Sequence, residues 1–280
     1  MKRALFNKKV CFSLRIFSYV STVLSLTFLL AIIVYVLVNG ADKITPSLFY
    51  ADDKAGPTIL PALVGTLELI LISLAIAVPL GVGSAIFLSE YAHRNSKAVK
   101  VIRVATETLA GIPSIVYGLF GYLVFVVALK TGYNILCGGI TLAIMIIPLI
   151  VRSTEESLLS VPNGLREGAL ALGASKYKTI FKVVLPSAAS GIVTSIILAA
   201  GRVISESAVL ILTIGMVVNK IPASLMSPGT SLALDIYYFA SHGYSKDAAA
   251  TAVILMALVL VINLSAYLIG RKVRKKTGAF

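Results

Sequence analysis

The sequence alternates between long apolar runs and short polar joints. Six of the runs are long enough to cross the hydrocarbon core of a bilayer, about 30 Å thick, as helices that rise about 1.5 Å per residue. They cover residues 16–38, 60–88, 108–129, 135–151, 187–218 and 248–270. The pattern therefore predicts an all-α, polytopic membrane protein with six transmembrane helices.

The composition supports this interpretation. Of the 280 residues, 58% are hydrophobic and 13% are charged, whereas soluble domains carry roughly 25% charged residues. A water-soluble globule is therefore excluded. The net charge of +13 comes from 25 Lys and Arg against 12 Asp and Glu. In a membrane chain such an excess indicates topology, and we expect no nucleic-acid partner.

Lys and Arg collect in alternate joints. They crowd the amino-terminal tail, the joints between the second and third runs and between the fourth and fifth, and the carboxyl-terminal tail. Because cytoplasmic segments are enriched in these residues, we expect both termini to face the cytoplasm, in a plasma-membrane protein surrounded by lipid. Cys11 and Cys137 then lie at opposite faces, and no disulfide is expected between them.

The longest outer joint, residues 219–247, contains several Pro and Gly residues and the apolar stretch IPASLMSPGTSLAL. Two interpretations are open. The joint lies against the membrane surface, or it is an ordinary loop packed between spans, and the second is favoured.

The segment of residues 152–186, on the predicted cytoplasmic side, is longer than a turn between two spans needs. Pro162 is typical of a helix start and Gly173 of a helix end. Ser175 can cap a second helix, which we expect to stop at Pro186. Two short helices at about a right angle would form a docking element for a partner. The alternative is an interfacial helix lying on anionic lipid.

The run EGALALGASKYKTIFKVVLP decides between these alternatives. It resembles the loop shared by the permeases of ABC importers, which reads E-A-A, three residues, G, nine residues, I, any residue, L-P. The residues at matching places are Glu167, Ala169, Gly173, Val183, Leu185 and Pro186. Gly168 stands where the family prefers alanine. Since glycine weakens a helix by roughly 1 kcal/mol relative to alanine, the first helix is expected to be looser.

This resemblance implies the fold of a type I ABC importer permease with a cytoplasmic coupling-helix loop. In that family the loop inserts into a cleft on a separate ATP-hydrolysing subunit. The expected ATPase-coupling residues are Glu167, Gly168, Ala169, Gly173, Tyr177, Leu185 and Pro186. The sequence contains no G-x-x-x-x-G-K-[ST] phosphate loop. We therefore expect no ATPase site, other catalytic site, metal or cofactor here, with ATP bound by the partner subunit.

Two charges lie inside the fifth apolar run, where charges are costly and so are candidates for function. Arg202 and Glu206 are four residues apart and would share one helical face as an ion pair. A buried guanidinium can bind a tetrahedral oxyanion through forked hydrogen bonds, which favours a substrate path. A pair that only holds the fifth span against its neighbours is the alternative.

Three further polar residues lie in or beside the spans. Arg152, at the cytoplasmic mouth of the fourth, either contributes to the anion path or snorkels to the interface. Ser114, after Pro113, either offers donors to an anion or marks a packing kink. Glu68 has no assigned role, and we expect it to be protonated, paired or turned toward a subunit interface.

The run LAAGRVISESAVLILTIG resembles the A-R-x-x-G-E-T-A-P-L-L segment of phosphate permeases of the PstA type, with Arg202, Glu206 and Ala208 at matching positions. Ser205, Ser207 and Val209 depart from it. Further matches are PLGVGSAIFLSEYA, GIPSIVYGLFGY, IPLIVRSTEESLLSVP and SLMSPG, so the resemblance covers about residues 60–270. Arg152 also matches a position of this family.

The resemblance implies a permease subunit that imports phosphate with the help of other chains. These are a homologous permease of the PstC type, a dimer of ATP-binding subunits of the PstB type and an extracytoplasmic phosphate-binding protein of the PstS type. A permease for sulfate or molybdate is the nearer alternative, and a self-contained secondary carrier or anion channel the more distant one. Residues 60–270 would form the permease domain, with the coupling loop at 152–186. Residues 1–59 precede it, and residues 271–280 form a basic cytoplasmic tail.

Overall fold

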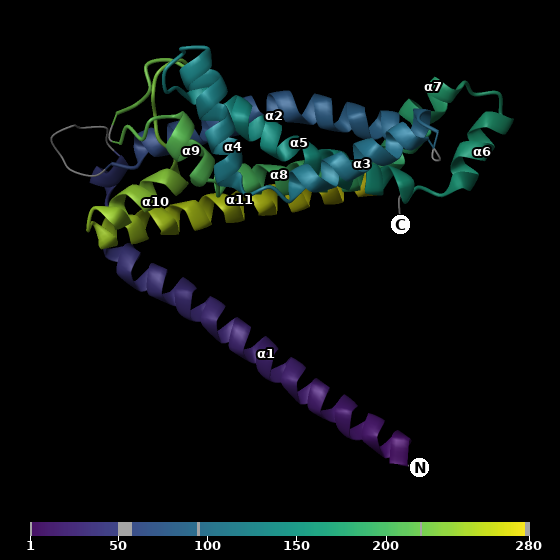
Figure 1. The fold of residues 1–280 in the computed structure, drawn as a ribbon, viewed down its shortest axis with the longest axis horizontal. Coiled ribbons are helices and arrows are strands. Elements are labelled where there is room, and N and C mark those ends of the chain that lie inside the picture. The colour runs from purple at the N-terminus through teal and green to yellow at the C-terminus, as the bar shows by residue number, and fades with distance from the viewer. Residues whose placement is uncertain (1, 50–57, 94–95, 219, 278–280) are drawn as a thin grey trace.

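The computed structural model describes residues 2–49, 58–93, 96–218 and 220–277. Within these ranges the chain is helical and contains no strand. Four long helices lie side by side along the long axis of the molecule (Figure 1). They are α2 (Leu60–Ile86), α5 (Ile135–Leu159), α8 (Leu185–Ile204) and α11 (Ser245–Thr277). This bundle confirms the predicted all-α, polytopic fold.

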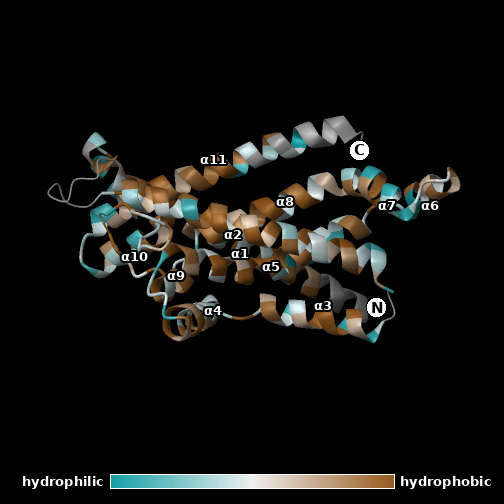
Figure 2. Cartoon of the chain, turned by 90° about the horizontal axis from the view of Figure 1, so that it is seen from above, coloured by the Kyte–Doolittle hydropathy of each residue, from teal (hydrophilic) through white to brown (hydrophobic). Residues whose placement is uncertain are grey.

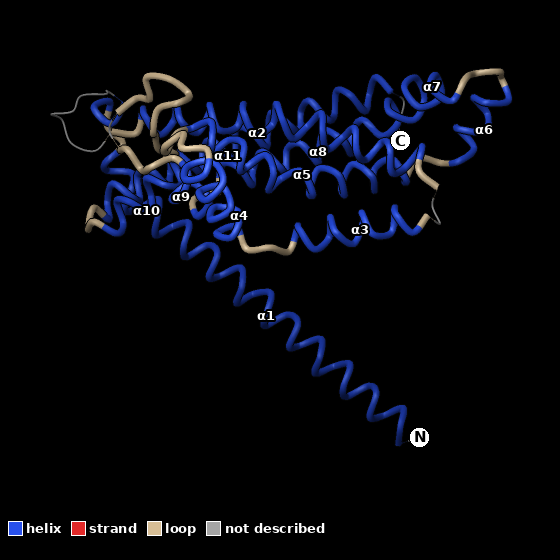
Figure 3. The backbone as a smooth tube through the Cα atoms, turned by 45° about the horizontal axis from the view of Figure 1, so that its top comes forward, coloured by secondary structure: helices blue, strands red, loops and turns tan. Residues whose placement is uncertain are grey.

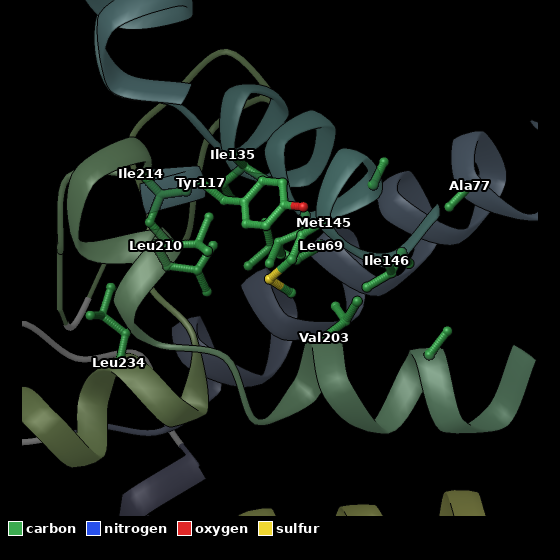
Figure 4. Close-up of a cluster of buried hydrophobic side chains, with 14 of the residues drawn as sticks. Leu69, Ala77, Tyr117, Ile135, Met145, Ile146, Val203, Leu210, Ile214 and Leu234 are labelled. Atoms are coloured by element: carbon green, nitrogen blue, oxygen red, sulfur yellow. The ribbon is translucent and has the colours of Figure 1, made fainter. Parts of the chain in front are cut away.

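The core surrounds α5, which packs against α2 and α8. Leu142, Ile146 and Ile150 of α5 are fully buried, with Leu69 of α2 and Val203 of α8 beside them (Figure 4). A helix that is apolar on all sides is typical of the centre of a membrane bundle. Figure 2 shows the apolar residues following the bundle helices, while hydrophilic residues gather at its ends.

Five helices are long and apolar enough to cross a membrane, and a bent pair makes up to six among the described residues. The pair is α3 (Lys97–Ala110) and α4 (Ser114–Gly121), the latter continuing as the π-helical η4 (Tyr122–Ala128). The bend between the two halves is 97°. The span predicted over residues 108–129 is therefore broken into two halves, and the packing kink that was one interpretation of Pro113 and Ser114 is confirmed.

Pro113 explains this bend, because proline has no N–H and disfavours helical geometry at the residue before it. The carbonyl of Leu109, four residues earlier, loses its usual donor. It accepts instead from the N–H of Ile112 at 3.1 Å and the hydroxyl of Tyr117 at 2.8 Å. The break is thus stabilised by a side chain from the second half.

The fifth span differs from its prediction at both ends. A continuous helix runs from Lys176 to Ile204, through α7 (Lys176–Thr179), the π-helical η5 (Ile180–Val184) and α8. The predicted stop at Pro186 was wrong, because the wider π turn accommodates the missing N–H and the ring of the proline. At the other end the helix stops at Ile204, and α9 (Ala208–Thr213) follows after a break.

The first span, α1 (Lys2–Gly40), extends away from the bundle (Figures 1 and 3). From residue 10 onward most of its apolar side chains are exposed, with Phe17 at 71%. It meets α11 near Gly40, where a Cβ atom would lie 2.6 Å from the carbonyl oxygen of Ala249. Two short 3-10 helices follow, η1 (Ala41–Lys43) and η2 (Pro46–Phe49).

The joint after α9 is a packed loop followed by a short helix, α10 (Leu232–Ser241). The carbonyls of Ser227 and Leu225 accept from the backbone N–H groups of Ile135 and Leu136, at 3.1 and 2.9 Å. These donors at the start of α5 would otherwise lack partners. These bonds favour the packed-loop interpretation, whereas Ile221, Leu225 and Met226 of the apolar stretch are exposed, so both interpretations stay open; Asn219 lies outside the described residues.

Candidate functional site

The predicted coupling segment forms a helical elbow at the end of the bundle opposite α9 and α10 (Figure 1). Its first helix, α6, covers Asn163–Ala171, and its second, α7, begins at Lys176. The hydroxyl of Ser175 accepts from the N–H of Lys178 at 3.3 Å, so the predicted cap is confirmed. Both elements therefore begin where local signals in the sequence indicated.

Gly173 ends α6 with φ at +82°. Its N–H donates to the carbonyl of Leu170 at 2.9 Å, and the N–H of Ala174 donates to that of Ala169 at 3.1 Å. This paired arrangement satisfies the last carbonyls of a helix and needs a left-handed residue at this place. Glycine adopts that conformation without strain, so residue 173 determines the shape of the elbow.

The outer face of the elbow is apolar and exposed. Leu172 is 90% exposed, Tyr177 63% and Leu170 50%, and the ring of Tyr177 lies 4.5 Å from that of Phe181. The other predicted coupling residues are placed along the same segment: Glu167 and Gly168 are exposed, and Ala169, Leu185 and Pro186 are half-buried. Together these residues form one continuous stretch of chain at the end of the bundle.

An ion pair anchors this elbow to the second span. The guanidinium of Arg166 in α6 donates to the Glu90 carboxylate at 2.8 Å, and Glu90 lies in the π-helical η3 (Phe87–Tyr91) that ends α2. Arg166 also donates to the carbonyls of Leu158 and Val161, at 2.8 and 2.6 Å. Neither residue was predicted from the sequence, although Glu90 occurs in the PLGVGSAIFLSEYA run and Arg166 directly precedes the EGALALGASKYKTIFKVVLP run.

Arg152 belongs to a charged cluster between α3 and α5. Its guanidinium lies 3.3 Å from the Glu107 carboxylate and 3.1 Å from that of Glu156. Beside it, Arg103 donates to Glu155 at 2.9 and 2.7 Å. These side chains line a cavity of about 310 Å³. The sequence placed Arg152 at the mouth of the fourth span but did not indicate its partners on α3.

Arg202 lies in the last turn of α8 and is exposed. It lines a cavity of about 110 Å³ together with Leu109, Ala110, Tyr117, Met145 and Leu149. The cavity lies at the bend between α3 and α4, and Figure 4 shows the Tyr117 ring beside Met145. No ion pair of Arg202 is present among the described residues. Ser114 opens α4 at the same bend, half-buried, and does not line this cavity.

Glu206 does not share a helical face with Arg202, because α8 ends between them. Its carboxylate accepts from the backbone N–H groups of Ala208 and Val209 at 3.1 and 3.4 Å. The predicted intrahelical pair was therefore wrong. The physical reason is that an acidic side chain beside a helix start satisfies N–H groups that have no partner within the helix.

Glu68 lies half-buried in α2, and one of its carboxylate oxygens is buried without a hydrogen-bond partner in the described part of the chain. The expectation that it is paired is not met within those residues. Whether it is protonated or turned toward another subunit stays a prediction.

Comparison with known proteins assigns the chain to a family. The model of the family described as binding-protein-dependent transport system inner membrane component matches residues 77–277. The chain belongs to this family. The matched region begins within α2 and includes the elbow, the Arg152 cluster and Arg202, whereas α1 lies outside it.

Relatives and solved structures agree with this assignment. The chain is 35% identical over 264 residues to the probable ABC transporter permease protein YqgI of Bacillus subtilis, covering 88% of this chain and 90% of that protein. It is 31% identical over 255 residues to the phosphate transport system permease protein PstA of Haemophilus influenzae, covering 88% and 89%. A structure of a bacterial alginate ABC transporter in complex with a pentasaccharide-bound periplasmic protein superposes with a TM-score of 0.67 at 16% identity, covering 89% and 91%. That likeness shows a shared fold.

The chain is therefore an ABC importer permease of the PstA type. It is a multi-pass component of the plasma membrane, and within its complex it is the membrane part rather than the ATPase.

Proposed function

We propose that the chain is the membrane-spanning subunit of an ATP-driven phosphate importer, in which it forms half of the translocation path and docks an ATP-hydrolysing subunit. The observation that carries the proposal is the exposed apolar elbow formed by α6 and α7. The elbow lies at one end of the molecule (Figure 1), and Leu172 and Tyr177 within it have most of their surface exposed. Tyrosine is a typical anchor of a protein interface, and the exposed leucine beside it enlarges the apolar patch.

The docking role assigns a task to each part of the elbow. Glu167, Gly168, Ala169 and Tyr177 meet the ATP-hydrolysing partner of the PstB type, while Gly173 sets the angle between the two helices. Leu185 and Pro186 begin α8 directly after the elbow. Because α7 and α8 form one continuous helix, a displacement of the elbow is passed directly into the fifth span. Both termini face the cytoplasm together with the elbow.

Phosphate is the proposed substrate for two reasons. The relative from Haemophilus influenzae is named for phosphate transport, and Arg202 presents an exposed guanidinium inside a span. A cation at that depth is costly unless a partner or a substrate neutralises it. Arg152 and Ser114 join the path at the cytoplasmic mouth and at the bend of the third span. Glu206 contributes by fixing α9 next to Arg202.

Because this chain forms only half of the translocation path, the complex contains a homologous permease of the PstC type, which forms the other half. Substrate reaches the outer side on an extracytoplasmic binding protein of the PstS type. ATP is bound by the partner subunits, and the chain itself holds no cofactor. An importer of another oxyanion, sulfate or molybdate, is the alternative that the Arg202 chemistry equally allows.

Uptake of labelled phosphate by proteoliposomes containing the four types of subunit tests the proposal. We expect uptake that needs ATP and the binding protein, that excess sulfate or molybdate does not suppress, and that Arg202→Gln lowers at least about tenfold, the loss of roughly one charge-assisted contact. Suppression by sulfate or molybdate would assign the other oxyanion. Anion flux through the chain alone, without partners, would instead make it a self-contained carrier or channel. Unchanged uptake by Arg202→Gln would disconnect this arginine from the path.

A further inference from the structure

We propose that Glu90 and Arg166 form a latch, an ion pair that joins the elbow to the cytoplasmic end of α2. Through this latch the conformational change of the ATPase moves the second span together with the fifth. The inference rests on the proposed function, because it assumes that a partner pushes on α6. It adds a second route from the elbow into the bundle, beside the continuous helix of α7 and α8.

The first argument is that α6 has little else to hold it. None of its side chains is buried, so apolar packing contributes little to its position. The strongest contacts between α6 and the bundle are those of Arg166, which reaches the carboxylate of Glu90 and the carbonyls of Leu158 and Val161. Among the described contacts, the guanidinium of Arg166 is therefore the direct side-chain link from α6 to the end of α2.

The second argument is the shielding of this pair. The side chains of Arg166 and Glu90 are 17% and 9% exposed, whereas the two partners in the Arg152–Glu156 pair are 55% and 67% exposed. Water screens an exposed pair, and its energy is small. A shielded pair holds its geometry more firmly, since losing one partner leaves an uncompensated charge in a poorly solvated place.

The third argument is a neighbouring contact from the other helix of the elbow. The ammonium group of Lys176, the first residue of α7, lies 5.0 Å from the centre of the Tyr91 ring. This distance is within the range of a cation–π interaction. Consecutive residues at the end of α2, Glu90 and Tyr91, are thus held by α6 and by α7. The elbow could therefore move without the second span only if the contacts of both α6 and α7 with the end of α2 were broken.

The discriminating variant is Glu90→Gln, in the complete complex. Glutamine preserves the size of the side chain and leaves the two carbonyl contacts of Arg166 in place, so that only the ionic part of the latch is lost. We expect the phosphate transported per ATP hydrolysed to fall at least about fivefold, the lower end of typical coupling between sites. Association with the ATP-binding subunit is expected to stay as in the wild type. Glu90→Asp, which retains the charge, should recover part of the ratio.

Two further variants make the outcomes separable. Lys100→Gln removes an exposed charge from α3 on the same side of the membrane and should leave the ratio unchanged. Glu167→Gln, in the docking face of α6, should weaken ATPase association instead. An unchanged ratio in Glu90→Gln, or a loss of association equal to that of Glu167→Gln, would overturn the latch. Failure of the wild-type chain to bind an ATPase at all would overturn the proposed function itself.

Discussion

Arg202 and Glu206 are separated by the end of a helix, and the Glu206 carboxylate accepts hydrogen bonds from the backbone of Ala208 and Val209. The acid therefore stabilises the start of α9 and leaves the charge of Arg202 exposed beside a small cavity. One residue of the motif stabilises the local backbone, and the other keeps the exposed charge that the proposed substrate path requires.

Glu206→Ala should destabilise the chain by about 1 kcal/mol, the usual cost of losing a helix-start acceptor. Glu206→Gln retains an acceptor oxygen and should remain close to the wild type. The chain has no Trp, but Cys137 is buried and free, so its reaction with a thiol-reactive dye on heating reports unfolding. The exposed Cys11 is replaced by serine in all variants. Equal unfolding temperatures for Ala and Gln would show that the contact does not stabilise α9.

Gly173 and Gly168 form a matched pair for testing the elbow. A Cβ atom at either position would meet no other atom within 4 Å, but only Gly173 has a positive φ. Gly173→Ala should cost about 1 kcal/mol in backbone strain and lower both ATPase association and uptake. Gly168→Ala introduces the residue that the resembling loops prefer here, so it should strengthen α6 by about the same amount and retain the partner contact and uptake. If bulky substitution of Gly173 left ATPase association and uptake unchanged, the docking assignment would be abandoned.

Gly65 permits close contact between α2 and the outer loop. A Cβ atom there would overlap the carbonyl oxygen of Thr230, whereas one at Gly83 in the same helix would meet nothing within 4 Å. Gly65→Ala should therefore destabilise the chain by about 1–3 kcal/mol, and Gly83→Ala should not. Thermal unfolding with the Cys137 reporter compares the two. Equal stability of both variants would mean that the outer loop around Thr230 shifts to accommodate the methyl group with little loss of free energy of unfolding.

Tyr117→Phe removes the hydroxyl that donates to the Leu109 carbonyl at the bend of the third span. The carbonyl retains the N–H of Ile112, so the cost should be at the lower end for a hydrogen bond, about 0.5–1 kcal/mol. The ring still fills its place beside Met145 (Figure 4). Unfolding temperature measures the loss, and a drop as large as that of Tyr117→Ala would indicate that the ring, rather than the hydroxyl, stabilises the bend.

Asp235 in α10, outside the spanning helices, makes stability depend on pH. Burial raises the pKa of its carboxyl from 3.8 to about 7, although the hydroxyl of Thr230 donates to it and acts in the opposite direction. The folded state therefore binds the proton more tightly than the unfolded chain, and this contribution is complete below about pH 4 and lost as the pH rises through 7. Asp235→Asn should remove this pH dependence of stability. As the pH rises from 4 to 7, the variant should therefore gain stability relative to the wild type. Loss of helical ellipticity on heating, measured across that range, checks the sign, and parallel curves for the two proteins would refute it.

The sequence by itself determined the class of fold, the approximate place of each span and the helical elbow with its caps at Ser175 and Gly173. Those features follow from the length of apolar runs and from residues a few positions apart, which is information that a local pattern contains. A kink at Pro113 was also among the interpretations that the sequence offered, since its cause is local, but the apolar run did not indicate how sharp the bend is.

Only the tertiary structure decided which charges meet. Arg103 and Glu155 are 52 residues apart in the chain, and Glu90 and Arg166 are 76 apart. No spacing rule connects such residues, because their contact depends on how whole helices pack. The same holds for Glu206, whose role changed when α8 ended before it, and for the loop whose carbonyls complete the start of α5. Local propensity places the helices, and long-range packing decides what their side chains do.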